Sequence, residues 1–190
     1  WLGLVGSEMC IRDRYQMNIN SIEIVGIILD VVNYAFVFLF LFSLLKVNYF
    51  NPIVSMLMKI YSPIEKISII RNRTVNIFFI SVLIEFITLM IYFGSQYETL
   101  SLAAVSVVKT LLLILRIIFF AVIGGVILSW VSPEKSNAFL ELVVEVSDKL
   151  MSPLRNIIPS AGGLDFSPLF ILIFINLTEN FLRNILSSIV

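Results

Sequence analysis

Four long apolar stretches constrain the fold of this 190-residue chain more than any other feature. A helix needs about 20 predominantly apolar residues to cross the hydrocarbon core of a bilayer. The stretches of that length are residues 22–45, 75–94, 102–131 and 167–189. Hydrophobic residues make up 59% of the chain and charged residues 14%, whereas soluble domains average about 45–50% and about 25%. We therefore expect an all-α membrane protein with four transmembrane helices.

The basic residues of the connections predict how the chain is oriented in the membrane. They are concentrated in the long connections 46–74 and 132–166, whereas the short turn 95–101 has none. These residues are Lys46, Lys59, Lys66, Arg71 and Arg73 in the first connection, and Lys135, Lys149 and Arg155 in the second. Because excess Lys and Arg mark the cytoplasmic side, we expect both long connections in the cytoplasm and both termini outside. The predicted location is the bacterial plasma (inner) membrane.

The composition argues against several functional classes. The chain contains no histidine and one cysteine, Cys10, so the commonest metal ligand and the commonest general base are missing. No Ser/His/Asp or Cys/His arrangement can be assembled, although a carboxylate-based site stays open. The net charge is zero, which gives no sign of nucleic-acid contact. We expect a protein that is not an enzyme and that has no cofactor and no metal.

The first residues do not look like part of the fold. Residues 4–13 read LVGSEMCIRD and resemble a translated sequencing adapter, so we expect residues 1–16 to be a non-native tail and Met17 to be the natural start. The alternative is a genuine, disordered N-terminal tail. The remaining chain divides into two halves, residues 17–100 and 101–190.

The two halves carry the same pattern at an offset of 86 residues, which aligns Asn51 with Asn137. Each half reads as a membrane helix, an amphipathic segment and a second membrane helix. Since both halves start outside, we expect two parallel repeats related by an axis along the membrane normal.

The amphipathic segments, residues 52–66 and 137–151, are too short to span a bilayer. In the second segment, Glu141, Glu145 and Lys149 form a polar stripe at a spacing of four residues. We expect both segments to be interfacial helices in the cytoplasmic connections. A soluble cap packed on the bundle is the alternative.

One block of motifs carries a family resemblance. It contains Ser129-Trp130-Val131, Ser152-Pro153-Leu154-Arg155, Ile157-Ile158-Pro159 and Gly162-Gly163-Leu164-Asp165-Phe166-Ser167-Pro168. With these motifs the chain resembles the YggT/YlmG family of small bacterial and plastid membrane proteins, in its two-repeat, proteobacterial form. Ala138 and Lys149 stand where prolines are usual. The first half lacks the Pro-Arg-Arg and Gly-Gly-x-Asp portions. The resemblance implies a poorly defined role linked to osmotic tolerance or to envelope and division organisation.

The motif block supplies the first group of candidate site residues: Pro153, Arg155, Pro159, Gly162, Gly163, Asp165, Ser167 and Pro168. The block can simply shape the entry into the last span, with Ser167 as N-cap, Pro168 as the first helical residue and Asp165 near the positive helix end. Alternatively it is a surface for a partner or a lipid, on which Arg155 binds an anionic head group.

Charges inside the apolar stretches supply the second group, because such residues are costly in a membrane and often functional. Glu85 and Arg116 fall near mid-bilayer, and we expect them to pair. The pair is either a structural clamp between the second and third spans or part of an ion or proton path. Asp30 lies at a depth similar to that of Lys109, so these two residues are the candidates for a second pair.

The sequence favours a scaffold or assembly factor that engages the lipid bilayer and unknown membrane or cytoplasmic protein partners. The alternative is a small channel or transporter component that uses the intramembrane charges. Ala121, Gly125 and Ser129 recur at a spacing of four residues, which lets helices approach closely. That contact lies either within the chain or between copies of a homo-oligomer.

Overall fold

A computed structural model describes residues 2–65, 70–131, 137–156 and 165–189, with the side chains of the first helix described from Ile22 onward. Within these ranges the chain is all helical, which confirms the predicted fold class. The helices are α1 (Leu2–Leu45), α2 (Pro52–Glu65), α3 (Arg73–Phe93), α4 (Thr99–Val131), α5 (Ala138–Arg155) and α6 (Ser167–Ile189).

Four helices are long and apolar enough to cross a membrane, judged by length and composition. They are the Ile22–Leu45 part of α1, then α3, α4 and α6. These segments agree with the four predicted stretches and with a multi-pass membrane protein. The helix ends differ from the predicted ends by a few residues. For example, α3 begins at Arg73, because the Asn72 side chain caps it by accepting from Thr74 N (3.1 Å) and Val75 N (3.5 Å).

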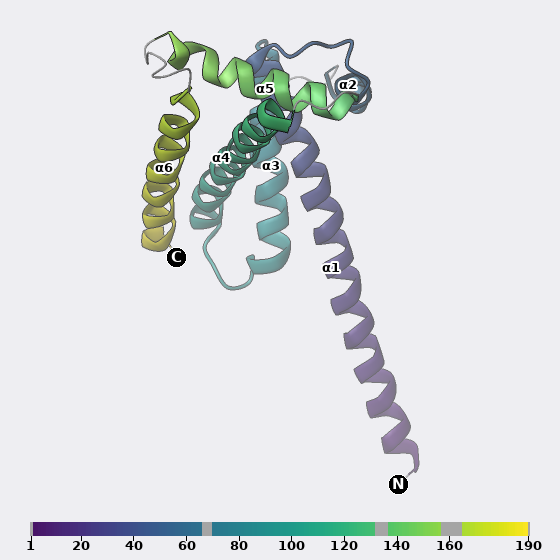
Figure 1. Cartoon of the computed structure of the whole chain (residues 1–190). Coiled ribbons are helices and arrows are strands. Elements are labelled where there is room, and N and C mark those ends of the chain that lie inside the picture. Colours follow the sequence, from purple (N-terminus) through teal and green to yellow (C-terminus); the bar gives the residue numbers. More distant parts are fainter. Residues whose placement is uncertain (1, 66–69, 132–136, 157–164, 190) are drawn as a thin grey trace.

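The four long helices form a bundle, and the two shorter helices lie across one end of it (Figure 1). Helix α3 packs between α1 and α4, and α4 also packs against α5 and α6. The turn between α3 and α4 and the C-terminal end of α6 lie at the opposite end of the bundle. Both amphipathic helices therefore share one end, as the sequence pattern requires.

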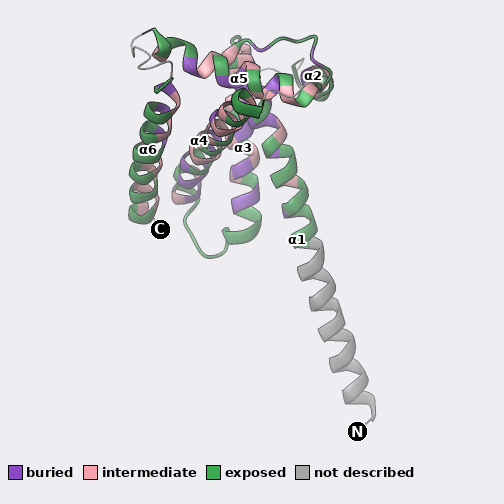
Figure 2. Ribbon diagram, viewed as in Figure 1, coloured by how far each residue is buried: buried purple, intermediate pink, exposed green. Residues whose placement is uncertain are grey.

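Apolar side chains anchor each short helix on the pair of long helices that it connects. Tyr61 of α2 is buried with Phe36 of α1 and Ile77 of α3. Met151 of α5 is buried with Val122 of α4 and Ile171 of α6. A further cluster joins the two halves, and its buried members are Phe42, Val47, Val54, Leu142 and Val146. The outward faces of the long helices remain exposed (Figure 2), as expected of helices that contact lipid.

Several helix ends fall at the expected 86-residue offset. Helix α1 ends at Leu45 and α4 at Val131, while α2 begins at Pro52 and α5 at Ala138. Asn51 and Asn137 cap these starts, accepting from Ile53 N (3.0 Å) and from Phe139 N (3.0 Å) respectively. The parallel symmetry of the two halves itself stays a prediction.

Helix α5 continues beyond the expected end at residue 151 and includes Pro153 in its last turn. Helix α2 likewise has Pro63 near its end. A proline inside a helix lacks the N–H donor and its ring clashes with the carbonyl four residues earlier, and both helices end two residues after their proline.

Candidate functional site

The corner between α5 and α6 brings part of the family motif together. The guanidinium of Arg155 donates from Nε to Asp165 Oδ2 (2.6 Å) and from Nη1 to Asp148 Oδ1 (3.0 Å). Asp165 lies two residues before the start of α6, whereas Asp148 lies two turns before Arg155 on α5. Arg155 therefore ties the end of the short helix to the start of the last span.

The charges of this corner reinforce one another. Burial by itself raises the pKa of the Asp165 carboxyl, but hydrogen bonds from Arg155 and Ser167 outweigh burial, so its pKa lies below the ordinary value. The hydrogen bond to Asp165 raises the pKa of Arg155. The pair is thus ionised at neutral pH, and its stabilising effect is lost only as the pH falls through the lowered pKa of Asp165. Because the Arg155 side chain is 43% exposed, the pair contributes at most about 1 kcal/mol.

The start of α6 differs from the expected capping pattern. Ser167 is the first residue of the helix and Pro168 the second, so the proline is not at the first helical position. The Asp165 carboxylate accepts from Ser167 N (2.9 Å) and takes the capping role expected of the Ser167 hydroxyl. That hydroxyl is buried and has no hydrogen-bond partner among the described residues. A carboxylate binds a helix N-terminus more strongly than a hydroxyl does, because it adds its charge to the hydrogen bond.

The other motif residues are placed only in part. Pro153 lies in the last turn of α5, and Pro168 lines a cavity of about 560 Å³ together with Trp130, Ser147 and Arg155. Pro159, Gly162 and Gly163 lie outside the described residues. The contact surface predicted for the whole block stays a prediction.

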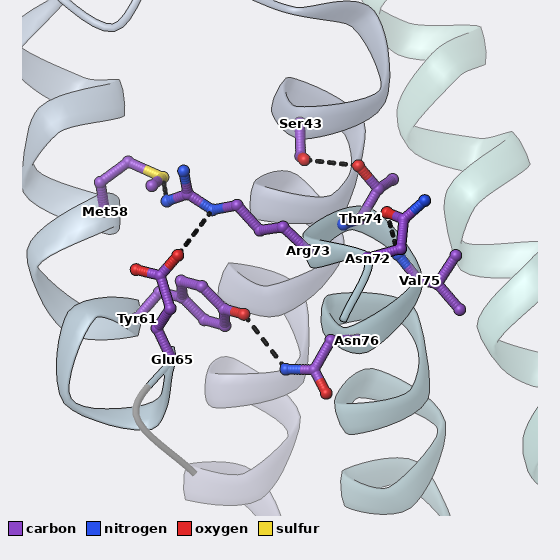
Figure 3. Close-up of polar contacts among 9 residues, drawn as sticks. All are labelled: Ser43, Met58, Tyr61, Glu65, Asn72, Arg73, Thr74, Val75 and Asn76. Carbon is purple, nitrogen blue, oxygen red and sulfur yellow. Dashed lines mark hydrogen bonds and ion pairs between the residues drawn. The ribbon is translucent and has the colours of Figure 1, made fainter. Parts of the chain in front are cut away.

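A different arginine organises the corresponding corner between α2 and α3 (Figure 3). Arg73 Nε lies 3.7 Å from Glu65 Oε1, and its guanidinium stacks over the rings of Tyr61 and Tyr49 at 5.4 Å and 5.9 Å. The Tyr61 hydroxyl accepts from Asn76 Nδ2 (3.1 Å). This first-half corner closes through aromatic and amide contacts instead of the Gly-Gly-x-Asp portion that it lacks.

The predicted polar stripe of α5 contacts the other half of the chain. Glu145 Oε1 accepts from the backbone N of Asn48 (2.8 Å), and Lys149 Nζ donates to the backbone carbonyl of Lys46. Asn51 Nδ2 also donates to the Ala138 carbonyl (2.7 Å). Together α2, α5 and the connection 46–51 form one continuous structure, which we call the terminal layer.

A polar network lies inside the bundle, within the membrane-spanning segments. Glu85 of α3 receives Lys109 Nζ of α4 at Oε1 (2.9 Å) and Asn33 Nδ2 of α1 at Oε2 (2.9 Å). Asn33 in turn accepts from Ser81 Oγ (2.6 Å). The network therefore links the three helices through Glu85, a buried residue of which 7% is exposed.

This geometry differs from the pairing expected from the sequence. Glu85 makes its ion pair with Lys109, and not with Arg116, among the residues that the structure describes. Arg116 lines the same cavity of about 350 Å³ as Asp30 and Glu85. Lys109 lies about two turns nearer the α3–α4 turn than Arg116 does, so hydropathy alone gave no basis for choosing between them. Lys109 was also the suggested partner of Asp30, but its ion pair is with Glu85.

Sequence reasoning missed the uncharged members of these sites. Asn33 and Asn76 stand inside apolar stretches, and a buried amide there needs a hydrogen-bond partner. That signal could have marked both positions. In the described ranges, no group of three or more His, Cys, Asp or Glu side chains could hold a metal ion.

Comparisons with known proteins find one family model and several relatives whose names assign no function. The CCB3/YggT family model matches residues 104–186. An uncharacterised protein of Haemophilus influenzae is 29% identical over 153 residues, which cover 76% of this chain and 81% of that protein. An uncharacterised protein of Pseudomonas aeruginosa is 37% identical over 83 residues, covering 44% and 42% respectively.

The uncharacterised protein YggT of Escherichia coli is 34% identical over 59 residues, covering 31% of each chain. The matched region thus spans less than half the length of the Pseudomonas and Escherichia relatives. No solved structure matches the chain.

Proposed function

This chain belongs to the CCB3/YggT family, with its match in residues 104–186, and on that premise we propose that it is a membrane scaffold or assembly factor. Its working surface is the terminal layer, which faces the cytoplasm of the bacterial inner membrane. Following the motif resemblance, we assign the role to osmotic tolerance or to envelope and division organisation.

The observation that carries this proposal is the continuity of the terminal layer. Side-chain contacts from α5 hold the connection 46–51 in place, so the two halves present one surface instead of two loops. Large apolar side chains remain outside the core on or beside this surface: Phe50 is 94% exposed and Trp130 is 79% exposed. Aromatic residues of this kind are enriched where a membrane meets water and at protein interfaces.

Site-specific photo-crosslinking tests the proposal in cells. A photoreactive residue at Phe50 or Phe139, both exposed on the terminal layer, should give discrete protein adducts. The same residue at Phe174, on the outward face of α6, serves as the matched control and should react mainly with lipid. The adducts from Phe50 should weaken in Glu145→Ala, because that variant removes the acceptor that holds Asn48. Identical adducts from all three positions would argue against a specialised surface.

The second candidate is a small channel or transporter component, and one observation favours it. The cavity of about 350 Å³ beside Glu85 contains opposite charges within the spanning segments, and such residues often line ion or solute pathways. Purified protein in liposomes should then conduct ions or osmolytes, and Glu85→Gln should reduce the flux while the protein stays folded. A wild-type protein that passes neither would eliminate this candidate.

A further inference from the structure

Arg116 is a charged residue of the spanning helices that makes no ion pair in the described part of the chain. It lies near the middle of α4, and its side chain is exposed toward the cavity that it shares with Asp30, Asn33 and Glu85. It makes no hydrogen bond and no ion pair with any other described residue. A guanidinium at this depth is stable only if it faces water, a ligand or an opposite charge.

Glu85 cannot pair with Arg116 without giving up contacts that it already makes. Both oxygens of Glu85 are engaged, one by Lys109 and the other by Asn33. Arg183, another cation of the cavity, donates to Glu179 one turn away on α6 (2.5 Å). The fork of the Arg116 guanidinium therefore remains available for an anionic group, which it can bind through two parallel hydrogen bonds.

Asp30 is a second charge of the same cavity that makes no ion pair. It lies on α1 and makes no hydrogen bond or ion pair within the described part of the chain, although the charges of Lys109 and Glu85 act on its carboxylate. Asp30 stands fifteen residues before the end of its helix at Leu45, and Arg116 stands fifteen residues before the end of its helix at Val131. One cavity is thus lined by a carboxylate and a guanidinium from two different helices, and neither group makes an ion pair in the described part of the chain.

The order of polar and apolar surface argues against a lipid as the occupant. A second cavity of about 520 Å³ adjoins the first, shares Lys109 and Arg183 with it, and extends toward Phe93 and Tyr97 at the α3–α4 turn. This second cavity is largely apolar, and its lining residues lie nearer the α3–α4 turn than those of the charged cavity do. A lipid places its charged head group at the membrane surface and its chains deeper, which is the reverse order.

We propose that the cavity between α1, α3, α4 and α6 binds a small zwitterionic solute, with its anionic group on Arg116 and its cationic group on Asp30. The amide of Asn33 and the carboxylate of Glu85 form the polar wall between these two contacts. A volume of about 350 Å³ lies at the lower end of the range for small-molecule sites, about 300–1,000 Å³. The solute is therefore of amino-acid size.

Calorimetric titration of the purified full chain in lipid nanodiscs tests this site. The zwitterionic probes are glycine, L-proline and trimethylglycine. Trimethylglycine has two single-charge analogues of similar shape, choline with only the cation and tert-butylacetate with only the anion. At least one zwitterion should bind, and each analogue should bind about tenfold more weakly than trimethylglycine, because each lacks one ion pair.

Two variants assign the ends of the ligand. Arg116→Gln should weaken zwitterion binding about tenfold or more and leave choline binding unchanged. Asp30→Asn should weaken zwitterion binding similarly and leave tert-butylacetate binding unchanged. Lys59→Gln, an exposed change on α2 far from the cavity, is the control and should bind like the wild type. Thermal unfolding of each variant shows whether a loss of binding is a loss of fold.

Absence of binding by all three zwitterions would overturn the proposal, as would equal binding of trimethylglycine and tert-butylacetate. Wild-type affinity in Arg116→Gln would overturn it as well. The titration contains no protein partner, so its failure would leave the scaffold proposal untouched, and a failed crosslinking experiment would leave this site untouched.

Discussion

At the scale of single residues, the carboxylate of Glu85 determines how three helices meet inside the membrane. It accepts from Lys109 and Asn33, and the Lys109 side chain is 45% exposed whereas that of Glu85 is 10% exposed. Removing the buried member of such a pair leaves its partner without compensation. The exposed lysine can still extend toward the nearer membrane surface, which limits the loss.

We therefore expect Glu85→Gln to lower the free energy of unfolding by about 1–3 kcal/mol, somewhat less than for a fully buried pair. Unfolding in mixed micelles measures this change. A double-mutant cycle with Lys109→Gln should show a coupling energy of about 1 kcal/mol or more, whereas the cycle with Arg116→Gln should be additive within about 0.5 kcal/mol. Stronger coupling of Glu85 to Arg116 than to Lys109 would instead support the pairing first expected from the sequence.

At the scale of helices, the contact between α4 and α5 depends on a residue without a side chain. A Cβ atom on Gly125 would lie 2.1 Å from Ser147 Oγ and 2.3 Å from Ser147 Cβ. Because the Cβ of Ser147 is fixed to the α5 backbone, the two helices would have to separate. A Cβ on the neighbouring Gly124 would meet only Val143 Cγ1, at 2.9 Å, which is a smaller overlap and involves a single atom.

The substitution Gly125→Ala should therefore destabilise the protein by about 1–3 kcal/mol, the usual cost of overpacking. Adding Ser147→Gly removes both clashing atoms and should restore part of the loss. Gly124→Ala is the matched control and should destabilise the protein less, since its Cβ overlaps one atom at a longer distance. Thermal midpoints in detergent, compared among these variants, measure the effect. Helix propensity favours alanine over glycine at both positions, so equal destabilisation by both substitutions would mean that the contact with Ser147 is not the cause.

This contact also shows what the sequence could and could not predict. The row Ala121, Gly125 and Ser129 indicated a close helix approach but left its partner open. The structure places Gly125 against α5 of the same chain and Ala121 beside the cluster that joins the two halves. Hydropathy and length predict where spans lie. The rotation of each helix about its axis depends on side-chain packing, which the pattern does not encode.

The same limit explains the other differences. Partner choice for Glu85 required the relative rotation of α3 and α4, and both Lys109 and Arg116 were compatible with the pattern. The capping of α6 by Asp165 instead of Ser167 depended on a shift of one residue at a helix end, the least predictable part of any helix. By contrast, the N-terminal ends of α2 and α5 follow from the Asn51 and Asn137 side chains themselves.

At the scale of the whole molecule, the charges are unevenly distributed between the two ends of the bundle. Lys59, Lys149 and Arg155 lie on the short helices at one end, whereas the α3–α4 turn at the other end has no basic residue (Figure 1). Basic residues close to membrane helices are retained on the cytoplasmic side during insertion. The terminal layer should therefore face the cytoplasm, and the turn should face outward.

Cysteine accessibility in intact cells tests this orientation. Starting from Cys10→Ser, which removes the single cysteine of the chain, Ser95→Cys in the turn should react with a membrane-impermeant maleimide added outside. Lys59→Cys on α2 should react only after permeabilisation. Positions 59 and 95 are both exposed in the folded protein, so the membrane is the only barrier between the reagent and residue 59. Equal labelling of both variants in permeabilised cells is the control. Labelling of Lys59→Cys alone in intact cells would show the opposite orientation, with the terminal layer outside. The basis for cytoplasmic partners would then be lost.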